Sequence, residues 1–153
     1  MQVPFVDLKT QYQSIKPEID NAIQSVIAKT AFISGEYAKE FEQKFAELYG
    51  VKHVIGCGNG TDSLYIIMKM LGIGAGDEVI TAGNSWISSS ETITQVGAKP
   101  VFTDPDNVYM SMSGEAVAKA VTIKTKAVIV VHLHGQMADM DEIQKVCKKH
   151  NLY

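Results

Sequence analysis

One glycine-rich turn constrains what this chain can fold into more than any other segment: residues 56–60, Gly-Cys-Gly-Asn-Gly. An apolar stretch at His53–Cys57 favours a strand before the turn, and Thr61-Asp62-Ser63 is typical of a helix start. Strand, turn and helix N-terminus form an anion pocket, because the first N–H groups of a helix lack partners and the helix dipole favours negative charge. Thr61 and Ser63 add hydroxyl donors, and glycine lets the backbone approach a phosphate closely. The turn therefore predicts a phosphorylated ligand in an α/β fold.

The charge of the chain limits its partners. Its 153 residues are enough for one domain with a core, and the formal net charge of −3 gives no broad attraction to nucleic acid or acidic membranes. All 14 basic residues are lysines, and arginine, which commonly binds phosphates through two N–H groups at once, is absent. An anion site must therefore use backbone N–H groups, hydroxyls or lysine, or arginine from outside these residues.

The two cysteines and the N-terminus bear on the compartment. Cys57 and Cys147 are far apart without the spacing of metal ligands, so we expect buried, reduced thiols and no metal. The N-terminus lacks the basic and apolar regions of a signal peptide, and no apolar run approaches membrane-spanning length. These features predict a cytoplasmic protein without a membrane segment.

Hydrophobic periodicity divides the chain into two predicted parts. It indicates a helix at Ser14–Lys29 and another from Glu36 to Tyr49, which form an N-terminal helical arm over residues 1–50. From residue 51 on, strands and helices alternate, which predicts βαβ units and a largely parallel sheet. The predicted strands are His53–Cys57, Glu78–Thr81, Pro100–Thr103 and Lys126–His132, and the predicted helices are Thr61–Leu71, Ser85–Val96, Ser113–Val121 and Met140–His150.

The C-terminal residues Leu152 and Tyr153 are apolar and follow the last predicted helix. In a βαβ chain this is where the next strand should start, so we expect the chain to be the first part of a longer protein. A natural end in a frayed helix is the alternative.

A dinucleotide is one alternative ligand for the turn. The segment resembles the nicotinamide-binding fingerprint, but Thr61 stands where its third glycine should be. The fingerprint also needs an acidic residue after the second strand, where this chain has Thr81-Ala82-Gly83. No Gly-Lys-Ser/Thr follows the turn, which excludes a P-loop. A nicotinamide-dependent oxidoreductase is therefore the weaker alternative.

Trp86, the only tryptophan, follows the second predicted strand among small polar residues. Ligands of open α/β sheets bind beyond the carboxyl ends of the strands. A flat aromatic side chain beside a phosphate cradle suits a planar aromatic cofactor stacked on its face. The equally open alternative is that Trp86 covers the core at a helix start.

Six segments, in order along the chain, resemble the DegT/DnrJ/StrS family of sugar aminotransferases. His53–Leu64 is similar to the phosphate cradle of the family, and Val131–Met140 to one of its later strands. The other four segments are Val3–Leu8, Phe32–Glu36, Gly76–Thr81 and Gly97–Phe102. The resemblance covers nearly the whole chain.

This resemblance implies the aspartate-aminotransferase fold, fold type I, with pyridoxal 5′-phosphate as cofactor. Residues 51–153 would be the first part of a three-layer α/β/α large domain with a mostly parallel sheet, and the C-terminal small domain would be absent. The resemblance also implies a homodimer, because enzymes of this fold build each site from two subunits.

The resemblance further implies roles for individual residues. Gly60 and Thr61 are expected to hold the cofactor phosphate by backbone N–H and hydroxyl groups, and Trp86 to stack on the pyridine ring. Asn59 is expected to shape the cradle, and Asp62 to cap the helix. The candidate substrate or neighbouring contacts are Phe32, Ser34, Asn84, His132 and Gln136. A hydrogen-bonded core position is the favoured alternative for His132.

Transamination needs two more groups, a lysine for the Schiff base and an acid opposite the pyridine nitrogen. The resemblance implies that both lie beyond Tyr153, so these residues hold half a cofactor site and no catalytic residue. We expect the intact protein to transfer an amino group from glutamate to a nucleotide-linked keto-sugar, in antigen, polysaccharide or antibiotic sugar biosynthesis. A regulatory or sensory member of the same fold without the lysine is the alternative.

Overall fold

The computed structural model describes residues 3–153. They form two compact units, of which the first ends at Gly56 and the second spans Cys57–Tyr153. The unit boundary thus falls inside the glycine-rich turn, and each unit is described by itself below.

The first unit contains helices α1 (Leu8–Ala28) and α2 (Glu36–Tyr49), and neither of them buries a side chain. The predicted start of α1 at Ser14 is wrong, because Asp7 Oδ1 accepts the N–H of Thr10 at 3.0 Å and caps the helix six residues earlier. The α2 boundaries match the expected ones. Gly50 ends α2 in the left-handed conformation, at φ 63°.

The second unit is built on three parallel strands, β1 (Glu78–Ala82), β2 (Lys99–Thr103) and β3 (Thr125–Ile129), in the order β2-β1-β3. The parallel sheet predicted from the alternating pattern is therefore confirmed. The third strand ends earlier than expected, before Val130–His132, because the central strand β1 pairs with it only as far as Ile129. The residues that follow β3 are then free to form a loop.

Tyr153 adds two ladder hydrogen bonds to the outer edge of β3. Its N–H donates to the carbonyl of Lys126 at 3.0 Å, and its carbonyl accepts the N–H of Val128 at 2.9 Å. This is the pattern of a parallel pair. Leu152 and Tyr153 thus lie where the sequence predicted another strand to begin.

The predicted strand at His53–Cys57 is wrong. A strand needs a neighbour to satisfy its backbone groups, and none pairs with this segment among residues 3–153. The Gly56 N–H donates instead to Glu42 Oε1 at 2.7 Å, within the first unit. Residues 53–57 have the apolar composition of a strand, but composition alone does not provide a neighbouring strand to pair with.

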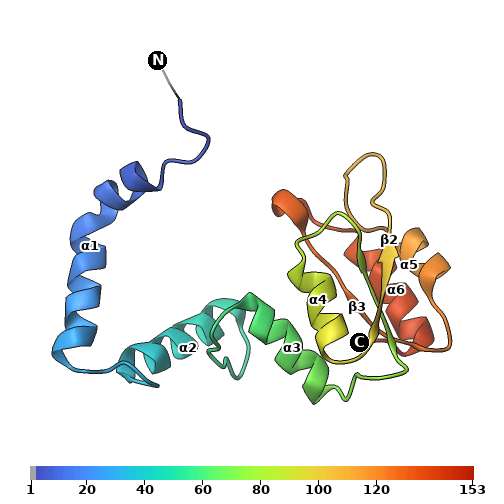
Figure 1. The fold of residues 1–153 in the computed structure, drawn as a ribbon, viewed down its shortest axis with the longest axis horizontal. Helices are drawn as coiled ribbons and strands as arrows, with labels where there is room; N and C mark the ends of the chain where they lie inside the picture. Colours follow the sequence, from blue (N-terminus) through green and yellow to red (C-terminus); the bar gives the residue numbers. More distant parts are fainter. Residues whose placement is uncertain (1–2) are drawn as a thin grey trace. The chain divides into compact units, whose positions relative to one another are not determined.

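Helices cover both faces of the sheet. On one face α3 (Gly60–Met70) and α4 (Ser88–Gln95) contribute to a core cluster with Val79, and on the other α5 (Gly114–Ala120) and α6 (Met140–His150) pack around Ile80. Figure 1 shows α4 on one side of the strands and α5 and α6 on the other. The resulting α/β/α layering confirms the predicted fold class.

Helix α4 starts at Ser88 rather than at the predicted Ser85. The Asn84 side chain donates to the carbonyl of Met110 at 3.0 Å, and the Ser85 hydroxyl pairs with that of Ser89 at 2.9 Å. These bonds are compatible with a turn over 83–87 rather than a first helical turn. Trp86 therefore stands in the loop before α4.

The connections of the sheet create a switch point between β1 and β3. The chain leaves β1 for α4 on one face, whereas it leaves β3 for α6 on the opposite face. Chain paths that leave two neighbouring parallel strands for opposite faces open a crevice at their carboxyl ends, where ligands of such sheets bind. The fold thus points to the loops after β1 and β3.

Candidate functional site

The loops after β1 and β3 carry four of the residues predicted to form the site, and Asn84 is the first of them, in the loop that follows β1. Trp86 lies in the loop that follows β1, and His132 and Gln136 lie in the segment that follows β3, around the short 3₁₀ turn η1 (Leu133–Gly135). The carboxyl ends of these two strands are joined by the Thr81 hydroxyl, which donates to the carbonyl of Ile129 at 3.3 Å. The switch point and the sequence motifs therefore indicate the same edge of the sheet.

The N-terminus of α3 forms the cradle that the glycine-rich turn predicted. Asn59 is extended, and its Oδ1 accepts the N–H of Asp62 at 2.9 Å, which makes Asn59 the N-cap. The expectation that Asp62 caps the helix is wrong; its carboxylate instead accepts from Asn59 Nδ2 at 3.0 Å. Asn59 directly precedes Gly60, the first residue of the helix, so it can cap, whereas Asp62 lies inside the helix.

Two N–H groups stay open at this helix start. Within residues 3–153, the N–H groups of Gly60 and Thr61 have no acceptor, as expected for the first turn of a helix. A Cβ added at Gly60 would meet nothing within 4 Å, so the space in front of these donors is empty of protein. The helix dipole adds partial positive charge there. The arrangement can bind an anion of phosphate size.

The hydroxyl of Thr61 links this cradle to α4. Its Oγ1 lies 2.8 Å from the Oγ of Ser88, the first residue of α4. Trp86 precedes Ser88 by two residues, and its carbonyl accepts the N–H of Ser89 at 3.1 Å. Thr61, the predicted phosphate contact, and Trp86, the predicted ring contact, thus stand at the starts of two helices that touch each other.

Trp86 itself is 76% exposed. It does not cover the core, so the alternative role at a helix start is wrong. A large aromatic side chain left open beside an anion cradle is available to a planar ligand. Asn84, two residues earlier, directs its amide nitrogen to the carbonyl of Met110 and so anchors this loop to the one after β2.

The loop after β3 orders its own polar side chains. His132 Nδ1 accepts the N–H of Ala138 at 3.2 Å, which leaves the Nε2 side of the imidazole open. The side chain is exposed, so the core position considered for His132 is wrong. Gln136 Nε2 donates to the carbonyl of Met137 at 3.1 Å. Both side chains are therefore held by the loop rather than by each other.

Phe32 and Ser34 lie in the first unit, between α1 and α2. Phe32 is exposed, and Ser34 adopts a positive φ of 48°. The group formed by α3, α4 and the loop after β3 belongs to the second unit.

The cysteines differ from the expectation of two buried thiols. Cys57 is exposed, because the segment around it is not a strand, and its Sγ lies 2.8 Å from the Ser63 hydroxyl at the start of α3. Cys147 is half-buried, and burial raises the pKa of its thiol. Over residues 3–153, no three His, Cys, Asp or Glu side chains are grouped in a way that could hold a metal ion. No α-helix described for this chain has the length and apolar character to cross a membrane.

The DegT/DnrJ/EryC1/StrS aminotransferase family model matches residues 13–153. The chain belongs to this family. The family prediction made from the six sequence segments is thus confirmed.

Two curated members of the family align with almost the whole chain. A pleiotropic regulatory protein of Geobacillus stearothermophilus is 45% identical over 99% of this chain and 41% of its own length. A UDP-2-acetamido-2-deoxy-3-oxo-D-glucuronate aminotransferase of Pseudomonas aeruginosa is 41% identical over 98% of this chain and 42% of its own length. The chain therefore spans about two fifths of the length of these relatives.

A solved structure from the same comparison supports the fold. The structure of ntda from Bacillus subtilis with bound cofactor PMP matches with a TM-score of 0.93 and 28% sequence identity. The match covers 99% of this chain and 35% of that one. The likeness confirms that residues of this DegT-family chain adopt the aminotransferase fold.

Ser88 is the one site residue that the sequence reasoning missed. Its hydroxyl contacts Thr61, and the residue is only 8% exposed. The run Ser88-Ser89-Ser90 gave a signal for hydroxyl groups at a helix start. Nothing in the sequence said which of the three would face α3, because that depends on where α4 begins.

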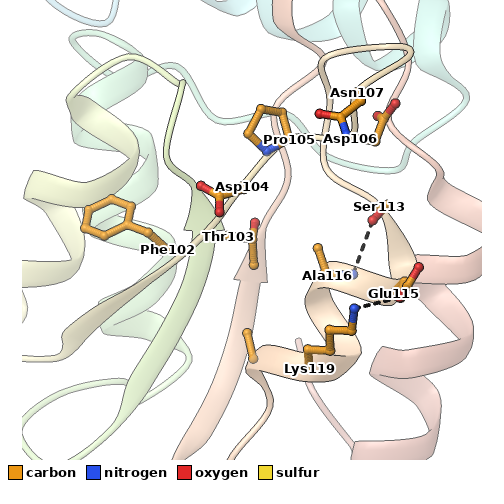
Figure 2. Close-up of a pocket in the computed structure, with 11 residues that line it drawn as sticks. Phe102, Thr103, Asp104, Pro105, Asp106, Asn107, Ser113, Glu115, Ala116 and Lys119 are labelled. Carbon is orange, nitrogen blue, oxygen red and sulfur yellow. Dashed lines mark hydrogen bonds and ion pairs between the residues drawn. The ribbon is translucent and has the colours of Figure 1, made fainter.

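A pocket with a volume of about 590 Å³ lies between β2 and α5 (Figure 2). None of the residues that line it belongs to the cradle at α3. Most of its charged groups are already paired. The Asp106 carboxylate accepts the N–H groups of Tyr109 and Val108, which lower its pKa, and the Glu115–Lys119 ion pair at 2.6 Å lowers the pKa of Glu115. The cradle at α3 is therefore the stronger candidate site.

The same pocket holds a buried hydroxyl, the Oγ1 of Thr103, which has no hydrogen-bond partner within residues 3–153, and the residue is only 5% exposed. We expect Thr103→Val to raise the free energy of unfolding by about 1 kcal/mol, because an unsatisfied buried hydroxyl is costly and valine has the same shape. Chemical denaturation followed by circular dichroism measures the change. Thr92→Val is the matched control, since the Thr92 hydroxyl is fully buried but donates to the carbonyl of Ser88 at 2.7 Å. Equal destabilisation of both variants would mean that Thr103 has a partner in solution.

Proposed function

We propose that this protein is a pyridoxal-5′-phosphate-dependent aminotransferase that acts on a nucleotide-linked keto-sugar. The observation that carries the proposal is the pair of open N–H groups of Gly60 and Thr61, together with the exposed ring of Trp86 two residues before Ser88, which contacts Thr61. Family membership supports the chemistry, and the aminotransferase activity for which the Pseudomonas relative is named supports the class of substrate. The amino donor in this proposal is an amino acid, with glutamate as the first candidate.

The residues at the cradle fit such a cofactor. Gly60 leaves room for a phosphate, the free N–H groups and the Thr61 hydroxyl can donate to it, and Trp86 offers an aromatic face. Pyridoxal 5′-phosphate, when bound, supplies an electron sink for breaking bonds at the amino-bearing carbon. The part proposed for these residues is to hold the phosphate and orient the ring.

The proposal also gives roles to the other candidate residues. Asn59 would fix the helix start that presents the donors, and Asn84 would hold the loop of Trp86 in place. The open Nε2 side of His132, the Gln136 amide, Phe32 and Ser34 are proposed to contact substrate. We assign the Schiff-base lysine and the acid opposite the pyridine nitrogen to none of residues 3–153.

The larger organisation belongs to the same proposal. Residues 51–153 would belong to the cofactor-binding large domain and residues 1–50 to its N-terminal helical arm. A cytoplasmic homodimer is the proposed state, supported by the exposed apolar side chains of α1 and α2, among them Ile15, Ile23 and Phe41.

Trp86 gives a direct test, because it is the only tryptophan of the chain. Titration with pyridoxal 5′-phosphate should quench its fluorescence in a saturable manner. Trp86→Ala should weaken cofactor binding, measured by equilibrium dialysis, by about fivefold, since stacking contributes about 1 kcal/mol. Trp86→Phe keeps an aromatic face and should lose much less. No saturable binding to the unaltered protein would refute the proposed function.

A regulatory function is the second candidate, and the 45% identical relative named as a pleiotropic regulatory protein is the observation that favours it. Both candidates predict cofactor binding, so binding alone does not separate them. Incubation with pyridoxal 5′-phosphate, glutamate and a UDP-linked keto-sugar does: an aminotransferase forms 2-oxoglutarate in step with aminated sugar, and a purely regulatory protein forms neither. The family match gives the nicotinamide-dependent alternative no support.

A further inference from the structure

The contact between Thr61 and Ser88 joins two hydroxyl groups that have no other side-chain partner among residues 3–153. Thr61 Oγ1 and Ser88 Oγ lie 2.8 Å apart, and either oxygen could be the donor. Ser88 is 8% exposed, whereas Thr61 is partly exposed beside the open N–H groups of α3. One end of this hydroxyl pair is therefore buried, and the other end faces the cradle.

The number of protons decides the direction of this hydrogen bond once an anion is bound. Each hydroxyl carries a single proton and can accept further hydrogen bonds through its lone pairs. A phosphate oxygen facing Thr61 can only accept, so the Thr61 proton must go to the phosphate. The Thr61–Ser88 bond can then persist only if Ser88 donates to Thr61.

We propose that Ser88 is a positioning residue, which donates its proton to Thr61 Oγ1 and thereby commits the Thr61 proton to the phosphate of the cofactor. This inference rests on the proposed function. The chain from Ser88 through Thr61 to phosphate is cooperative, because an oxygen that accepts a hydrogen bond becomes a stronger donor. It also fixes the rotamer of Thr61, so less freedom is lost when the anion binds.

The location of Ser88 ties the two proposed cofactor contacts together. Ser88 is the first residue of α4 and directly follows the loop of Trp86. The Ser88 carbonyl accepts a hydrogen bond from the buried Thr92 hydroxyl at 2.7 Å. The Thr61–Ser88 hydroxyl pair therefore fixes the position of the proposed phosphate contact on α3 relative to the proposed ring contact before α4. Neither helix start would have this constraint if Ser88 were alanine.

A double-mutant cycle on the binding of pyridoxal 5′-phosphate tests the inference. Ser88→Ala should weaken binding about fivefold in the unaltered background, the effect of losing one hydrogen bond, and have almost no further effect in Thr61→Val. Ser88→Thr keeps a hydroxyl at the same carbon and should retain most of the affinity. Ser90→Ala is the matched control, since the Ser90 hydroxyl lies in the same helical turn but donates to the carbonyl of Ile87.

Pyridoxal, which lacks the phosphate, separates positioning from general disruption. Ser88→Ala should leave the weak quenching of Trp86 by pyridoxal unchanged. Equal losses for pyridoxal and its phosphate, additive effects of Ser88→Ala and Thr61→Val, or no effect of Ser88→Ala would each overturn the inference while the proposed function stands. Failure of the unaltered protein to bind pyridoxal 5′-phosphate would overturn the proposed function and this inference with it.

Discussion

Replacing Gly60 with valine is expected to weaken the binding of pyridoxal 5′-phosphate by about a hundredfold or more, a loss of at least about 2.7 kcal/mol. An added Cβ at this position would meet no atom of another part of the described chain within 4 Å, so we expect the fold to accept the side chain. Cβ atoms of a helix lean toward its N-terminus, which at Gly60 is the space in front of the open N–H groups. The valine would therefore occupy the volume proposed for the phosphate. Equilibrium dialysis of the cofactor measures the loss.

Gly74→Ala is the matched control for this variant. Its added Cβ would lie 3.5 Å from the carbonyl oxygen of Val96, an ordinary contact, and the position is remote in sequence from the cradle. We expect the control to bind the cofactor normally and both variants to keep the circular dichroism spectrum of the unaltered protein. A Gly60→Val variant that folds and binds the cofactor with unchanged affinity would show that the phosphate lies elsewhere.

The fold could be predicted from the sequence wherever an element carried its own signal. Alternating apolar strands and amphipathic helices gave the parallel sheet, and Gly50 gave the end of α2. One error depended on a distant partner, because residues 53–57 have the composition of a strand but no neighbour to pair with among residues 3–153. Another was local, because α1 begins early through a capping contact from Asp7 to Thr10, three residues later.

The candidate site divides along the same line. Gly60, Thr61 and Trp86 were predicted from local chemistry, namely a glycine turn before a helix and an aromatic residue after a strand. Ser88 and the cap at Asn59 could not be chosen in advance, because several hydroxyl and amide side chains stand near each helix start. Only the packing of α3 against α4 selects Ser88 as the neighbour of Thr61. Phe32 and Ser34 were predicted as substrate contacts from the resemblance alone. They lie in the first unit, so the geometry of the second unit does not test that prediction.

Replacing Ile80 with alanine is expected to lower the free energy of unfolding by about 3–4 kcal/mol, the cost of removing a large side chain from a packed core. Ile80 is fully buried in the central strand β1 and contributes to the core cluster beneath α5 and α6. Strand β1 also leads into the loop of Trp86, so its stability underlies the candidate site. Urea denaturation followed by circular dichroism measures the change, and the slope of the transition checks that the denatured state is unaltered.

Ile123→Ala tests whether burial, rather than residue type, causes this loss. Ile123 is 99% exposed before β3, so its replacement should change the free energy of unfolding by less than about 0.5 kcal/mol. Because both variants remove the same atoms, their difference isolates the packing of Ile80 between the sheet and the α5–α6 layer. Similar small losses at both positions would contradict a three-layer core, since a sheet covered on one face only would leave Ile80 open to water.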